Sequence, residues 1–90
     1  MADREHDLKC WPEPFKAVVS GRKRFEWRVN DRDFRVGDFL LLREWSEDAG
    51  YTGHCARLRV TYLLTGRFGV LDGFVVMSLA PRPKEDDNGK

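Results

Sequence analysis

With 90 residues, 16 lysines and arginines, 15 acidic residues and a net charge of +1, the chain has room for one small domain and no global excess of positive charge. Its two cysteines are too few for a disulfide framework, and no apolar run approaches the ~20 residues that cross a bilayer. We therefore expect a reduced, cytoplasmic protein with no membrane partner.

Composition divides the chain into a folded middle and two polar ends. Residues 1–5 are polar, and residues 80–90 combine prolines with a charge run, so we expect both to be disordered tails. Residues 6–79 then form a single domain. Its first element is a short strand over His6–Cys10, where the side chains alternate.

A short helix is predicted next. Apolar residues recur at helical spacing and form one stripe, namely Trp11, Phe15, Val18 and Val19. Two prolines fall in its first turn, where they are tolerated, and Gly21 supplies the stop.

After the glycine, the side chains alternate with period two, which predicts a strand. Phe25, Trp27 and Val29 point one way, and we expect this apolar face to be core. The opposite face is polar and carries Arg24, Glu26, Arg28 and Asn30.

The second half of the domain is predicted to be mostly strands. Residues 39–42 form an unbroken apolar run, which indicates a central strand covered on both sides. We expect a loop over residues 46–53, a long strand over 54–64, a turn over 65–73 and a last strand over 74–79. In the long strand the residues expected to face inward are Ala56, Leu58, Val60, Tyr62 and Leu64.

These elements predict a mostly β domain of the α+β class with one or two helices. The expected architecture is a small mixed β-barrel or strongly bent sheet, with a helix over one opening.

Lys23, Glu26 and Arg28 are the strongest candidates for a site, because a lysine and an arginine beside one carboxylate can bind anions or transfer a proton. The alternative is an ordinary ion pair on a strand face. The surrounding segment 16–35 holds seven basic residues against three acidic ones. The four possible soft metal ligands, His6, Cys10, His54 and Cys55, have no metal-site spacing, so we predict no metal and no cofactor.

The segment Gly21-x-Lys23-x-x-Glu26-x-Arg28 resembles the G-x-K-x-x-E-x-R signature of ASCH domains. Further strings over residues 30–39, 42–45 and 51–53 resemble an ASCH-related family of short bacterial and phage proteins. The resemblance covers residues 6–79. It implies a PUA-like β-barrel with a cleft between the first helix and the barrel, lined by Lys23, Glu26 and Arg28, that binds RNA or modified nucleotides.

Some small ASCH proteins are amidohydrolases that remove acyl groups from modified cytidine with a threonine, a lysine and a glutamate. By the resemblance, Lys23 matches that lysine, but Glu26 stands where the threonine is expected. The nucleophile of those enzymes is therefore missing here.

Three functional hypotheses follow. The first is an RNA or nucleotide binding module in which Lys23 and Arg28 meet phosphate or a base edge, and Glu26 orients Arg28 or accepts a hydrogen bond from a base amino group. The positive surface would be extended by four further arginines, Arg22, Arg24, Arg32 and Arg35. Stacking faces would come from two aromatic residues, Trp11 and Tyr51.

The second hypothesis is a small hydrolase acting on modified nucleosides or RNA, with Glu26 as general base and Lys23 as its partner. The third is a protein interaction module that uses the charged face.

Overall fold

A computed structural model describes residues 4–81. Its elements in chain order are β1 (Glu5–Cys10), α1 (Pro12–Val19), β2 (Phe25–Val29), β3 (Phe39–Ser46), β4 (Gly50–Leu64), the 3-10 turn η1 (Gly66–Phe68) and β5 (Phe74–Pro81). Strand β1 thus starts one residue inside the predicted N-terminal tail, and β5 runs two residues into the predicted C-terminal one. The other tail positions, 1–3 and 82–90, lie outside the described residues, and Arg4 precedes β1.

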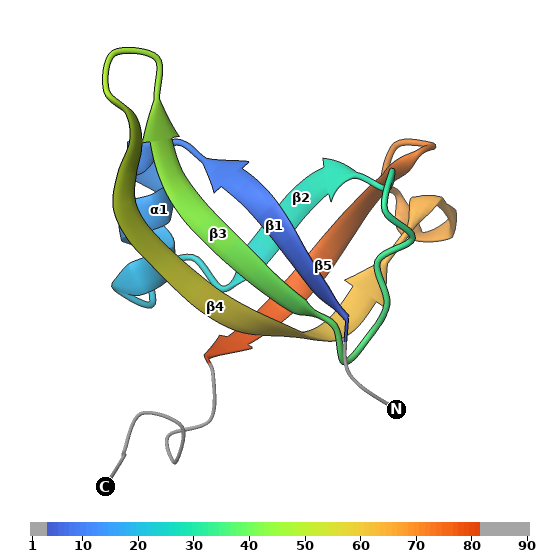
Figure 1. The fold of residues 1–90 in the computed structure, drawn as a ribbon. Helices are drawn as coiled ribbons and strands as arrows, with labels where there is room; N and C mark the ends of the chain where they lie inside the picture. The colour runs from blue at the N-terminus through green and yellow to red at the C-terminus, as the bar shows by residue number, and fades with distance from the viewer. Residues whose placement is uncertain (1–3, 82–90) are drawn as a thin grey trace, which may run out of the picture.

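The strands of the described part form one five-stranded sheet in the order β1-β3-β4-β5-β2. Strand β1 pairs with β3 in parallel, and the other pairs are antiparallel. The sheet curls into a half barrel, so that its two edge strands, β1 in blue and β2 in teal, approach each other across the opening (Figure 1). The expectation of a mostly β domain with one helix and a strongly bent sheet is confirmed.

The core lies inside this curl. Leu40 and Leu42 of β3 are fully buried, and β3 lies in the interior of the sheet, between β1 and β4, although the middle strand is β4. Only one face of β3 is fully covered, because its apolar run alternates between buried and half-buried side chains. Helix α1 contacts β3 and adds Phe15 and Val18 to the same core.

The predicted helical stripe is only half right. Trp11 and Val19 are 54% and 61% exposed, so the buried side of α1 is narrower than the spacing indicated. The helix has just eight residues, and Trp11 is its N-cap, outside the regular turns.

The two faces of β2 are the reverse of the prediction. Glu26 is buried at 5% exposure, whereas Phe25, Trp27 and Val29 are each about half exposed. The period of two is correct, but β2 is an edge strand, and its inner face lies opposite polar groups of β1 across the opening of the half barrel. The Phe25 face is therefore the outer surface of the sheet and not the core.

Two further expectations fail in the β3–β4 region. Residues 46–53 are not a loop, because β3 continues to Ser46 and β4 resumes at Gly50, which leaves a tight hairpin. Tyr62 is 61% exposed, because the register of β4 against β5 shifts between Val60 and Tyr62. Such a bulge inserts one residue and turns the following side chains to the other face.

The helix of the described part is too short and too polar to span a membrane.

Candidate functional site

A groove of about 540 Å³ lies between the end of β1, the start of α1 and the edge strand β2, which lines it with side chains of both faces. Its lining combines charged, aromatic and apolar side chains: Lys9, Cys10, Trp11, Pro14, Lys23, Glu26, Trp27, Arg28, Val29 and Phe74. It contains all three signature side chains and one of the two predicted stacking residues.

The turn after α1 brings Lys23 to this groove. Gly21 adopts φ +84°, a conformation that favours glycine, and the Lys23 amide donates to the carbonyl of Ala17 at 3.0 Å. The chain then enters β2, where alternation turns Glu26 and Arg28 to the same inner face.

Glu26 is the centre of the site. Lys23 Nζ donates to its Oε1 at 3.1 Å, and Arg28 Nε donates to its Oε2 at 2.6 Å. The carboxylate is buried, while the side chains of Lys23 and Arg28 keep 21% and 26% exposure. A buried carboxylate thus holds two cations that still reach solvent, and hydrogen bonds between ionised partners are the stronger kind.

Two arginines span the gap between the edge strands. Arg28 Nη2 donates to the carbonyl of Lys9 at 2.6 Å, and Arg32 Nη1 donates to the carbonyl of Asp7 at 3.0 Å. Both carbonyls belong to β1 and are two residues apart, so they point to the same free edge. Side chains, in place of a backbone ladder, join β1 to the segment that begins with β2.

Two half-exposed tryptophans line the groove. Trp11 packs edge-on against Trp45 with ring centres 5.4 Å apart, and Trp27 stacks on Phe74 at 5.1 Å. Lys9 Nζ lies 4.3 Å from the ring centre of Trp45. Neighbouring rings hold each tryptophan while half of its surface faces solvent.

Sequence reasoning missed Lys9 and Trp27 as lining residues. Trp27 follows Glu26 directly, but the expectation that its face was core removed it from consideration. Lys9 alternates outward on β1, which marks it as exposed but not as part of a site.

Cys10 is buried in the groove wall. Burial raises the pKa of its thiol, Glu26 raises it further, and Lys23 and Arg28 oppose these effects. Because the thiolate is the reactive form of cysteine, this environment disfavours a nucleophilic role.

The other predicted binding residues lie outside the groove. Arg24 donates to the carbonyl of Gly21 at 3.1 Å, Arg35 pairs with Asp33 at 2.7 Å, and Arg32 holds the edge of β1. Tyr51 lies on the β3–β4 hairpin under Arg43, with 4.5 Å between Arg43 Cζ and the ring centre. The positive surface around the groove is therefore smaller than the sequence indicated.

A second polar cluster, on β3 and β4, was not anticipated. Thr52 Oγ1 donates to Oε1 of the buried Glu44 at 2.9 Å, and His54 Nδ1 lies 3.2 Å from the same oxygen. These contacts lower the pKa of Glu44, with the Thr52 hydroxyl as the largest cause and His54 next. The three side chains tie the hairpin together.

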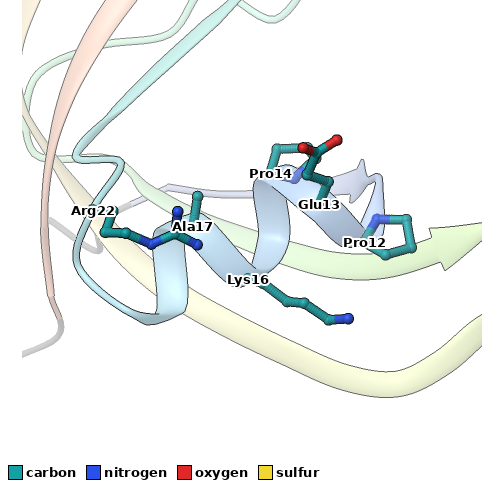
Figure 2. A pocket seen from close by; sticks show the side chains of 6 residues that line it. All are labelled: Pro12, Glu13, Pro14, Lys16, Ala17 and Arg22. Carbon is teal, nitrogen blue, oxygen red and sulfur yellow. The ribbon is translucent and has the colours of Figure 1, made fainter.

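A hollow of about 570 Å³ lies over the outer side of α1 and Arg22. Its charged side chains, Glu13, Lys16 and Arg22, point in different directions (Figure 2). They do not converge on one position. Within residues 4–81, no three His, Cys, Asp or Glu side chains are grouped so that they could hold a metal ion.

The chain matches a family model described as "Domain of unknown function (DUF3850)" over residues 5–79. It is also similar to a protein of Escherichia phage P2 described as "Uncharacterized 12.9 kDa protein in GpA 3'region", with 36% identity over 61 residues. The aligned part is 68% of this chain and 55% of the phage protein, so the chain spans about half the length of that relative.

Proposed function

Since this chain belongs to the DUF3850 family, whose description specifies no ligand, we propose from its own groove that it is an RNA or nucleotide binding module. The observation that carries the proposal is the buried Glu26, which holds Lys23 and Arg28 in a groove that is also lined by the half-exposed Trp11 and Trp27.

The chemistry of the groove fits a nucleotide in two respects. Its charged lining residues are three cations, Lys9, Lys23 and Arg28, against the single carboxylate of Glu26, so its net charge is positive and attracts phosphate. The exposed faces of Trp11 and Trp27 can stack on a base, which every base permits. Pairing to Glu26 fixes the positions of the two signature cations before any ligand arrives.

The size of the positive surface favours a short ligand. Arg32 and Arg35 are engaged by acceptors of this chain and Arg24 lies in another groove, so few cations remain to follow a long backbone. We therefore propose a mononucleotide or a short single strand, in preference to a duplex.

We also propose that the DUF3850 fold is a PUA-like barrel related to ASCH domains. Two observations support this relation: the half-barrel sheet with one helix, and a groove beside that helix lined by Lys23, Glu26 and Arg28.

Titration of the tryptophan fluorescence with adenosine monophosphate and with short single-stranded RNA, at several salt concentrations, tests the binding proposal. Lys23→Ala should weaken binding about tenfold and reduce the salt slope for RNA by about 0.7, the value for one phosphate contact on a single strand. Arg67→Ala is the matched control, because Arg67 is an exposed cation on η1 that does not line the groove. Binding that responds equally to both changes would reject the proposal.

A small hydrolase is the second candidate, favoured by the 3.1 Å contact between Lys23 and Glu26 inside a groove. Both oxygens of Glu26 already accept hydrogen bonds from cations, so one contact must break before the carboxylate takes a proton from water. Incubation with N4-acetylcytidine and with RNA separates the candidates: turnover that Glu26→Gln abolishes establishes the enzyme, and binding without turnover favours the module.

A further inference from the structure

Among residues 4–81, strand β2 has a strand partner on one of its edges only. It pairs with β5 and stands last in the sheet, so its other edge is free of strands of the described part. The ends of the β2–β5 ladder show which backbone groups face β5. The carbonyl of Arg24 accepts from the Leu79 amide at 3.0 Å, and the Asn30 amide donates to the carbonyl of Gly73 at 2.8 Å.

Every second residue of β2 directs its backbone groups to the free edge. In an antiparallel pair, residues that exchange both backbone bonds with the partner alternate with residues that exchange none. Arg24 and Asn30 belong to the first set, so the amides and carbonyls of Phe25, Trp27 and Val29 point away from β5. No backbone group of residues 4–81 pairs with them. These donors and acceptors are therefore available to a ligand.

The candidate groove runs along this free edge. Trp27, Arg28 and Val29 all line the groove, although consecutive residues of a strand point to opposite faces. Only the edge of the strand, where its two faces meet, borders one groove with all three residues. The free amide and carbonyl of Trp27 therefore lie in the wall of the groove. Phe25 has the same backbone direction but does not line the groove.

The charged side chains of the groove offer a ligand donors but no free acceptor. Lys9, Lys23 and Arg28 carry N–H groups alone. Both oxygens of Glu26 already accept hydrogen bonds from cations. These side chains suit a phosphate, whereas a base needs an acceptor as well as a donor. The backbone of Trp27 supplies the two together.

We propose that the free edge of β2 reads the base of the bound nucleotide, with the Trp27 amide donating to its Watson–Crick edge and the Trp27 carbonyl accepting from it. This inference rests on the proposed function. Each unmodified base carries a donor beside an acceptor on that edge, and proteins read unpaired RNA bases there. In a duplex both groups are occupied by the complementary base. The substrate class is therefore a nucleotide or single strand whose Watson–Crick edge is free and unmethylated.

The reading edge is fixed before a ligand arrives. Trp27 stacks on Phe74 with ring centres 5.1 Å apart, and the other edge of β2 is paired with β5. Arg28 donates to the carbonyl of Lys9 at 2.6 Å and ties β2 to β1 across the groove. A donor and an acceptor that are already ordered lose little conformational freedom on binding. Their alignment therefore contributes to the choice of ligand.

Titration of the tryptophan fluorescence with adenosine monophosphate and two analogues tests the proposal. The N6,N6-dimethyl analogue has no donor on its Watson–Crick edge and should bind at least about fivefold more weakly, the lower bound for a bidentate base contact. The 7-deaza analogue keeps that edge and should bind within about twofold of the parent nucleotide. Equal affinity for the parent and the dimethyl analogue would overturn this inference and leave the proposed function standing. If neither adenosine monophosphate nor single-stranded RNA binds, both are rejected.

Amide hydrogen exchange, read by NMR, locates the contact. Saturating adenosine monophosphate should slow exchange at Trp27 about fivefold, the equivalent of one net hydrogen bond. Phe25 is the matched control, because its amide points to the same edge outside the groove and should keep its rate. Ribose 5-phosphate, which has the phosphate without the base, should leave both amides unchanged. Equal slowing at Trp27 and Phe25, or slowing at Trp27 by ribose 5-phosphate, would contradict base reading by this edge.

Discussion

Replacement of Glu26 by glutamine should destabilise the fold by removing one negative charge from between two cations. Glutamine keeps one acceptor oxygen for Lys23 or Arg28 but presents an amide group to the other cation, so one charge-assisted bond is lost. Bonds to charged groups contribute about 1.5–3 kcal/mol, and the partial exposure of both cations lets water offset part of the loss. We expect a loss of about 2 kcal/mol in the free energy of unfolding.

Urea unfolding at neutral pH, followed by far-UV circular dichroism, measures this change. For a domain of this size, 2 kcal/mol corresponds to a melting temperature lower by about 10 °C. Glu47→Gln is the matched control, because Glu47 is exposed in the turn of the β3–β4 hairpin. If the Glu26→Gln protein unfolds within 0.5 kcal/mol of this control, a margin of about the size that surface substitutions produce, the argument that Glu26 holds the two cations is refuted.

Three further predictions concern the rest of the domain. Burial alone would raise the pKa of Asp38, but hydrogen bonds from His6, Arg4 and the Arg35 amide hold this pKa below its usual value. The ionised Asp38 therefore stabilises the fold, and Asp38→Asn should remove that stabilisation. The difference in unfolding free energy between the two proteins should be complete above about pH 5 and disappear as the pH falls below about 4. Urea unfolding of both proteins across this range would contradict the reasoning if their difference were independent of pH. Trp27→Ala should lower the free energy of unfolding by about 1 kcal/mol, because Trp27 is half exposed, and Leu42→Ala should lower it by about 3 kcal/mol, because Leu42 is fully buried. Equal decreases in the two proteins, measured by thermal unfolding, would argue against the assigned faces of β2. Thr52→Val should raise the pKa of Glu44, and a carboxyl NMR titration that shows no increase would exclude the hydroxyl as the main cause of the lowered value.

Local patterns in the sequence were sufficient for the order of the elements and for the proximity of Lys23, Glu26 and Arg28. The spacing Gly21-x-Lys23-x-x-Glu26-x-Arg28 encodes a turn and an alternating strand, and alternation alone puts Glu26 and Arg28 on one face. These are short-range properties of the chain.

Which face of β2 is buried depends on residues far away in the chain. Arg28, on the polar face of β2, donates to the carbonyl of Lys9, 19 positions earlier in the chain, so this face meets a partner that is distant in sequence. The bulge after Val60 has a similar origin, since it arises from the register of β4 against β5. Neither β2 nor β4 carries a local pattern that reports these long-range contacts.

The side-chain closure of the barrel also affects how the protein behaves at high concentration. Arg28 and Arg32 occupy the carbonyls of Lys9 and Asp7, two acceptors that an intruding strand would otherwise use to extend the sheet at β1. Charged guanidinium groups at that edge repel a second molecule of the same kind. The two hydrogen bonds thus leave fewer free acceptors on the β1 edge for a strand of another molecule, which is one of the ways in which edge strands are protected from edge-to-edge association.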